Sequence, residues 1–430
     1  MNRRGRVLIS LCGIALLSLG GAAEAPAQGT LASLQQDIGR ELALAGPADG
    51  AIVYDVTAKK MLFSERAGTL RPPASVEKLY TATAALEQMG PATRLSTSVY
   101  GVGRLAPGGI WQGDIYLRGG GDPTFGSSSF IASHYGGMGA SVATLVSQIV
   151  RHDGIHHITG SVNGDESFLD SLRGEPSSGY SFDPFLEGVL SGLAFNRGES
   201  GGEPGPHGPA AYAARELWRS LKNDGVTIGG GAGAAKTPAG ASLLARVSSP
   251  TLTQLLGLML PPSDNFFAET LTKDLGALYG GSGTTAAGAG VVRGAIDRLL
   301  GFAPRVVDGS GLSPADKTSP SEVLQLLVRL YPTPLGTLLR EHLAVAGRSG
   351  TLEGRMRHTG AEGRCRGKTG TLEGVSNLVG YCQAANGHIL AFAIFTDGIS
   401  IESAHLFQDH IAISLADSRL SAAETARGGA

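Results

Sequence analysis

The chain has 430 residues, of which 42% are hydrophobic and 17% are charged, and its formal net charge at pH 7 is −2. A chain of this length is too long to fold around a single hydrophobic core of ordinary size, so we predict a globular protein of two or three domains. No basic block suggests a nucleic-acid partner, and no apolar run after the N-terminus is long enough to span a membrane.

The first 27 residues have the pattern of an export signal. Three arginines stand within the first six residues, an apolar run follows from Val7 to Leu19, and Ala25-Pro26-Ala27 offers a small-residue cleavage site. The apolar run is shorter than the roughly 20 residues that a membrane-spanning helix needs. We therefore predict a signal peptide over 1–27 and a protein exported to a periplasm or cell-wall zone. The alternative is an uncleaved anchor.

The next part of the chain, 28–92, predicts a helix, a hairpin and a second helix. An amphipathic pattern covers 28–45, and strand-like runs at 51–56 and 61–65 flank a short turn. Residues 71–90 begin as a loop with two prolines and continue as a helix, because apolar residues recur at helical spacing until a Gly-Pro pair ends it.

Residues 93–246 have a different character. Short strand-like runs alternate with glycine clusters, and a Gly/Pro-rich stretch covers 198–209. We predict an inserted, mainly-β region of one or two small domains.

Helical and strand patterns return over 247–416. Helices are expected at 249–260, 263–278, 319–331 and 403–416, and strands at 367–372, 376–383 and 388–395. The predicted fold class is therefore α+β, with an antiparallel sheet that joins the N-terminal and C-terminal hairpins, is flanked by helices, and is split by the inserted region. The last residues, 417–430, are small and polar and predict a disordered tail.

Three short motifs occur in order: Ser75-Val76-Glu77-Lys78, Ser263-Asp264-Asn265 and Lys368-Thr369-Gly370. The SxxK and KTG patterns each occur once. A second SxN copy at 161–163 lies in the inserted region beside a turn, and we interpret it as a decoy. The first two motifs are expected to begin helices and the third to lie on a strand, which is the context of the SxxK, SDN and KTG set of penicillin-recognising acyl-transfer enzymes.

The residue types fit nucleophilic catalysis. A serine hydroxyl needs a base, and a lysine three residues later on a helix faces the same side. The amine of Lys78 must be neutral to accept a proton, and burial and the second cation, Lys368, would both lower its pKa. The backbone N–H groups of Ser75 and Thr371 are candidate donors to an oxyanion. The alternative for Ser75 is a helix cap and nothing more.

The chain resembles D-alanyl-D-alanine carboxypeptidases of the penicillin-binding protein 4 type, whose catalytic domain is β-lactamase/transpeptidase-like. Besides the motifs, "SPTLTQLLGLMLPPSDN", "DGSGLSP" at 308–314 and the stretch 350–381 carry the resemblance. It implies hydrolysis of the terminal D-Ala-D-Ala bond of peptidoglycan stem peptides, and of D-Ala–diamino acid cross-links in some members, through an acyl-serine. It also implies inhibition by β-lactams and no cofactor.

The resemblance also implies roles for single residues. Ser75 would be the nucleophile, Lys78 would accept its proton, and Ser263 would relay protons to the leaving group. The substrate would be bound by residues after the inserted region and by one residue within it: Asn265, Lys368, Thr369, Gly370 and Thr371, together with Asp165 and Arg355 near the diamino acid.

Two rival functions remain open. A class A β-lactamase carries a glutamate in an ExxLN segment between the second and third motifs, and no such segment occurs in 266–367. A non-catalytic wall-binding protein of the same fold would be expected to have lost the nucleophile or its base.

Other chemistry-bearing residues are interpreted as structural. Four polar residues around 152–157, His152, Asp153, His156 and His157, are interpreted as a solvated loop, and we predict no metal. Asp308 is interpreted as a turn-forming residue. Cys365 and Cys382 lie on two arms of a hairpin, either as a cross-strand disulfide or as buried free thiols.

Overall fold

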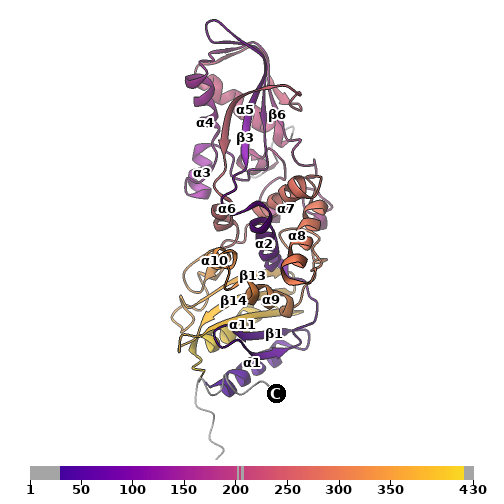
Figure 1. The fold of residues 1–430 in the computed structure, drawn as a ribbon, viewed down its shortest axis with the longest axis vertical. Coiled ribbons are helices and arrows are strands. Elements are labelled where there is room, and N and C mark those ends of the chain that lie inside the picture. The colour runs from indigo at the N-terminus through magenta and orange to yellow at the C-terminus, as the bar shows by residue number, and fades with distance from the viewer. Residues whose placement is uncertain (1–29, 201–202, 205–207, 421–430) are drawn as a thin grey trace, which may run out of the picture.

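The computed structural model describes residues 30–200, 203–204 and 208–420. It shows an elongated molecule with a sheet toward each end and a layer of helices between them (Figure 1). The expected signal peptide, 1–27, lies outside the described residues. The prediction of a disordered tail over 417–430 is wrong for its first residues, because Asp417 belongs to the last helix and Leu420 is buried. Residues 421–430 lie outside the described part of the chain.

A six-stranded antiparallel sheet joins the two ends of the chain, as the sequence predicts. Its strand order is β12-β13-β14-β15-β1-β2. Neighbouring residues of a strand face opposite sides, so Leu378 faces one core of the protein and Val379 faces another. The strands are β1 (Gly50–Asp55), β2 (Lys60–Glu65), β12 (Ala344–Val345), β13 (Cys365–Leu372), β14 (Val375–Gln383) and β15 (Ile389–Asp397).

Helices cover both faces of this sheet. On one face lie α1 (Leu31–Ala45) and α11 (Ile401–Asp417), which share a core with the sheet. The opposite face carries the central helices: α2 (Lys78–Met89), α6 (Leu252–Met259), α7 (Asn265–Tyr279), α8 (Thr285–Leu300), α9 (Pro320–Leu330) and α10 (Pro334–Glu341). Among the described residues, no helix is long and apolar enough to cross a membrane.

The inserted region forms a second, mixed sheet. Strand β4 pairs antiparallel with β3 and parallel with β6. The strands are β3 (Ser96–Ala106), β4 (Ile110–Arg118), β5 (His157–Ile158), β6 (Val162–Asp165), β9 (Thr227–Ile228), β10 (Ala232–Ala234) and β11 (Ser242–Ser248). A separate short ladder joins β7 (Glu199–Ser200) to β8 (Glu203–Pro204).

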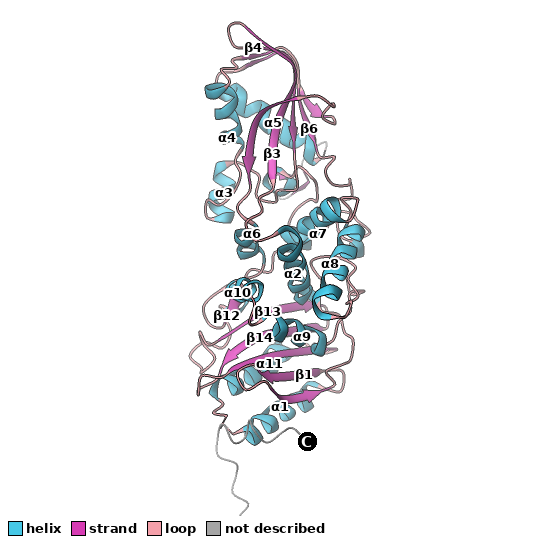
Figure 2. Ribbon diagram, viewed as in Figure 1, coloured by secondary structure: helices cyan, strands magenta, loops and turns pink. Residues whose placement is uncertain are grey.

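This region contains more helix than the sequence analysis predicts. Helices α3 (Ser128–Tyr135), α4 (Val142–Ser147) and α5 (Pro209–Asn223) pack beside the second sheet (Figure 2). Helix α5 begins with a proline at its first turn and buries Leu217 and Leu221, which recur at helical spacing. The sequence pattern predicts no helix here, and the Gly/Pro-rich stretch that it does indicate, 198–209, ends where α5 begins.

The inserted region is not confined to its own core. Tyr135 of α3 and Leu186 are buried together with Phe267 of α7 in the core of the central helices. The ring of Tyr135 meets the ring of Phe267 edge-on, with centroids 5.5 Å apart. The inserted region therefore packs directly against the helix that begins with the second motif.

Candidate active site

Ser75 lies in the one-turn helix η1 (Ala74–Glu77), immediately before α2. Lys78 is the first residue of α2, and its Nζ donates to Ser75 Oγ over 2.8 Å. No side chain caps the start of either helix. The interpretation of Ser75 as a helix cap is therefore wrong, since its hydroxyl faces the lysine instead of a backbone N–H.

The amine of Lys78 is completely buried and has three acceptors. Besides Ser75 Oγ, they are Asn265 Oδ1 at 2.6 Å and the carbonyl oxygen of Ser310 at 2.7 Å. Burial lowers the pKa of Lys78 to about 8, although nearby carboxylates, first of all Asp308, raise it. Burial, rather than the charge of Lys368, is thus the main cause of the lowered pKa.

The second motif lies at the start of α7, and its three side chains have different partners. Asp264 caps the helix by accepting from the backbone N–H of Phe267 over 2.9 Å. Ser263 and Asn265 are therefore not needed as caps, and their side chains reach the lysines of the other two motifs. Ser263 has a φ of +70°, a conformation that is costly for a non-glycine residue and is frequent at functional sites.

The third motif lies on β13. Lys368 is completely buried, and its Nζ donates to Ser263 Oγ over 2.7 Å and to the carbonyl of Thr369 over 2.9 Å. Burial and the charge of Lys78 hold the pKa of Lys368 well below its usual range. The site therefore contains two hydrogen-bonded groups: Lys78 with Ser75 and Asn265, and Lys368 with Ser263.

The sheet also holds the loop that precedes the nucleophile. On β14, Asn377 donates its side-chain N–H groups to the carbonyls of Pro72 and Pro73, over 3.0 and 2.8 Å. On β13, a Cβ added to Gly370 would lie 2.4 Å from the carbonyl oxygen of Pro73, so only glycine lets the strand approach this loop. Thr371, the next residue on β13, is exposed.

Two predicted site residues lie apart from this group. Asp165 ends β6, and its two carboxylate oxygens accept the backbone N–H groups of Ser167 and Thr237 over 2.9 and 2.8 Å. Burial raises the pKa of Asp165, but these hydrogen bonds outweigh it and the net shift is downward. Arg355 donates to Asp409 on α11 over 2.7 Å. Both remain predictions as contacts to a diamino acid.

Sequence reasoning missed the residues that the inserted region brings to the second motif. Arg197, only 15% exposed, forms an ion pair with Asp264 and donates to the hydroxyl of Tyr135 over 3.0 Å. The carbonyl of Phe185 accepts from Asn265 Nδ2 over 2.7 Å. No motif marks either residue. Arg197, whose φ is +61°, contacts Asp264 through a side chain that is distant in the sequence, and Phe185 acts through its main chain.

Asp308 has the structural role that the sequence indicates. Its carboxylate accepts the backbone N–H groups of Gly311 and Ser313, each over 2.7 Å, and so closes a tight loop. Among the residues that the structure describes, no group of three or more His, Cys, Asp or Glu could hold a metal ion. His152, whose side chain is 87% exposed, pairs with Asp153.

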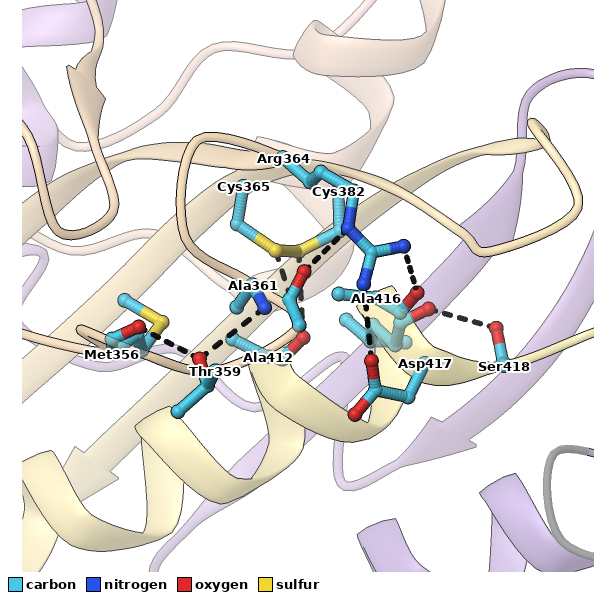
Figure 3. Close-up of a disulfide and its surroundings, with 12 residues drawn as sticks. Met356, Thr359, Ala361, Arg364, Cys365, Cys382, Ala412, Ala416, Asp417 and Ser418 are labelled. Atoms are coloured by element: carbon cyan, nitrogen blue, oxygen red, sulfur yellow. Dashed lines mark hydrogen bonds and ion pairs between the residues drawn. A yellow bond between two sulfur atoms is a disulfide. The ribbon is translucent and has the colours of Figure 1, made fainter.

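The two cysteines form a disulfide on the face of the sheet opposite the active site. Cys365 and Cys382 stand directly across from each other on β13 and β14. Figure 3 shows the bridge above α11, where both sulfurs approach the carbonyl of Ala412. Because Lys368 lies three positions after Cys365 on one strand, an odd number, their side chains point to opposite faces.

The fold and the site together define a serine acyl-transfer enzyme of the penicillin-recognising class. The SxxK and SxN motifs at helix starts meet the KTG motif on β13, which lies between β12 and β14 in an antiparallel sheet. The model of the D-Ala-D-Ala carboxypeptidase 3 (S13) family matches residues 28–181 and 206–418. The chain therefore belongs to this family and is a serine D,D-peptidase.

Individual relatives agree with this assignment. A D-alanyl-D-alanine carboxypeptidase of Actinomadura sp. is 31% identical over 505 residues, covering 96% of this chain and 90% of the relative. A carboxypeptidase of Mycobacterium tuberculosis is 29% identical, covering 76% of this chain and 71% of the relative. The crystal structure of penicillin-binding protein 4 from Haemophilus influenzae has a TM-score of 0.71 at 20% identity, with coverage of 89% and 97%, and shows the same fold.

Proposed function

We propose that the chain hydrolyses the terminal D-Ala-D-Ala bond of peptidoglycan stem peptides, with Ser75 as the nucleophile and Lys78 as its base. The observation that carries this proposal is the 2.8 Å hydrogen bond between Lys78 Nζ and Ser75 Oγ, inside a buried site where the pKa of the lysine is about 8. A base with a pKa near the working pH combines an adequate neutral fraction with a strong drive to take the proton.

In the acylation step, Ser75 Oγ attacks the carbonyl carbon of the penultimate D-Ala while its proton passes to Lys78. The backbone N–H groups of Ser75 and Thr371 would stabilise the oxyanion, each contributing on the order of 10²-fold. The tetrahedral intermediate then expels the terminal D-Ala, whose amine takes a proton from Ser263 Oγ. The proton that Lys78 took from Ser75 replaces the one that Ser263 gave up, and the enzyme is left as an acyl-serine.

Deacylation reverses the proton flow. A water molecule attacks the ester carbonyl, gives a proton to the neutral amine of Lys78, and breaks the bond to Ser75 Oγ. The hydroxyl of Ser75 takes that proton back as it leaves, so the enzyme returns to its starting state with no change in proton count. Asn265 would hold the substrate's amide, and Lys368, Thr369, Gly370 and Thr371 would form the site for its terminal carboxylate.

The cellular setting is part of the proposal. The predicted export signal and the family's substrate support a location in a periplasm or cell-wall zone. The penicillin-binding protein 4 of Haemophilus influenzae has also been solved with a β-lactam bound, at a TM-score of 0.67 to this chain. We accordingly expect β-lactams to acylate Ser75 and to act as inhibitors.

The proposal is tested by intact-mass measurement after the purified protein is mixed with benzylpenicillin. We expect a long-lived adduct of one drug molecule, absent in Ser75→Ala, together with release of D-alanine from a peptide that ends in D-Ala-D-Ala. Rapid loss of the drug without an adduct would indicate a β-lactamase instead. No adduct and no drug loss would contradict catalysis and favour a wall-binding protein.

A further inference from the structure

The amine of Lys78 can act as a base only if its lone pair points at Ser75. A neutral amine has two N–H groups and one lone pair, and Lys78 Nζ has three polar neighbours. Asn265 Oδ1 and the carbonyl of Ser310 can only accept hydrogen bonds. When both accept, they occupy the two N–H groups, and the lone pair is left facing Ser75 Oγ at 2.8 Å.

The carbonyl of Ser310 therefore decides the orientation of the base, and it belongs to the loop 308–313. We propose that Glu269 is a positioning residue for catalysis, because its carboxyl group holds this loop so that the Ser310 carbonyl meets Lys78. Glu269 Oε1 accepts the backbone N–H groups of Gly309 and Ser310 over 2.9 and 2.7 Å. This inference rests on the proposed function, in which Lys78 is the base.

The loop is held from two sides. Glu269 reaches it from α7, one turn after Asn265, and Thr81 reaches it from α2, where its hydroxyl donates to the carbonyl of Gly309 over 2.8 Å. Thr81 lies one turn after Lys78. The helix that carries the base and the helix that carries its amide partner thus both hold the backbone that supplies the third acceptor.

Glu269 holds the loop at a cost to stability. Glu269 is completely buried, and among the described residues its Oε2 has no hydrogen-bond partner. Leaving a buried polar oxygen unpaired costs about 1–3 kcal/mol. Its Oε1 accepts two neighbouring N–H groups at once, and those groups belong to the two peptide planes immediately before that of the Ser310 carbonyl.

The charged groups around Lys78 come from every element packed against it. They are Glu77 of η1, Asp264 and Glu269 at α7, Asp308 of the loop, Glu187 of the inserted region and Lys368 of β13. Removing a hydrogen-bond acceptor of the Lys78 ammonium group, or a carboxyl group near it, makes the charged form less stable and so lowers the pKa of Lys78. Admitting water to the site has the opposite effect, because it returns the lysine toward its ordinary pKa of 10.5.

The test compares acylation by benzylpenicillin across pH for the wild type, Glu269→Ala, Glu269→Gln and a matched control, Asp274→Ala. Asp274 lies on the same helix, is also completely buried, and has no hydrogen-bond partner among the described residues. Glutamine keeps an acceptor oxygen for both loop N–H groups. Circular dichroism and thermal unfolding of each variant report whether the fold is retained.

We expect Glu269→Ala to lower the maximal acylation rate about 10- to 100-fold, which is a substantial part of what a general base contributes. The pH range over which the rate rises should also shift to lower pH. Glu269→Gln and Asp274→Ala should stay within about threefold of the wild type. An equal loss in Glu269→Ala and Asp274→Ala, or a rise moved to higher pH, would show general loosening and overturn the inference. An unchanged rate in Glu269→Ala would also overturn it.

If Glu269→Ala does not fold, Thr81→Val decides the question, since it removes only the hydroxyl that holds Gly309 from the other side. A lower maximal rate with the rise at lower pH supports the inference, and a wild-type profile overturns it. A wild-type protein that forms no adduct at Ser75 would instead contradict the proposed function, so the two failures are distinguishable.

Discussion

The rate of acylation should depend on pH through the single proton of Lys78. The neutral amine is the reactive form, and its pKa is about 8 because the side chain is completely buried. Below this pKa the amine is protonated and cannot accept the proton of Ser75. The rate should therefore rise with pH through the range below 8 and level off above it.

The size of the effect follows from the pKa. The neutral fraction of an amine with a pKa of about 8 is roughly 1% at pH 6, 10% at pH 7, 50% at pH 8 and 90% at pH 9. The acylation rate should thus increase about 50-fold from pH 6 to pH 8 and less than about twofold from pH 8 to pH 9. A lysine of ordinary pKa would have a neutral fraction about 300-fold smaller at pH 7.

The assay is the second-order rate of benzylpenicillin acylation, measured by intact mass between pH 6 and pH 9 at constant ionic strength. Ser75→Ala is the control for adducts at other nucleophiles. A rate that is flat across this range would show that Lys78 is not the base. A tenfold rise per pH unit that continues up to pH 9 would show that burial does not lower its pKa in solution.

Three further variants test the supports of the site. Arg197→Met leaves the buried carboxylate of Asp264 unpaired and should lower the free energy of unfolding in urea by about 3–5 kcal/mol, with slower acylation; an unchanged midpoint contradicts the role of the pair. Gly370→Ala should fold but acylate about 10²-fold more slowly in the benzylpenicillin assay, because the strand must move away from the nucleophile's loop; a wild-type rate contradicts this close approach. Serines in place of Cys365 and Cys382, which close a loop with a sequence separation of 17, should lower stability by up to about 3 kcal/mol in thermal unfolding and leave the acylation rate unchanged.

The parts of the fold that the sequence predicted are those with a clear local pattern. The hairpins β1–β2 and β14–β15 have strand-like runs separated by turn residues, and the structure confirms both. Helices α7, α9 and α11 have apolar residues at helical spacing and are confirmed. Helix α8 was missed because its first half, "TAAGAGVV", is rich in alanine and glycine, residues that carry little periodic signal.

The same contrast applies to the site. Ser75, Lys78 and Ser263 could be found because their spacing on helices and their order along the chain carry the chemistry. Arg197 and the Ser310 carbonyl could not be found in this way, because their roles depend on contacts between residues far apart in the sequence. A main-chain acceptor in particular leaves no trace in residue type.

The inserted region, which separates the first two motifs along the chain, also determines how they meet. Asn265 has an amide with one donor end and one acceptor end, and either end could face Lys78 if nothing fixed it. The carbonyl of Phe185 can only accept, so the nitrogen of Asn265 must face it and the oxygen must face the lysine. With the amide reversed, an N–H group would point at the amine's own N–H, and the lone pair would no longer be held toward Ser75. The inserted region therefore helps to orient the amine of Lys78, as the loop 308–313 does.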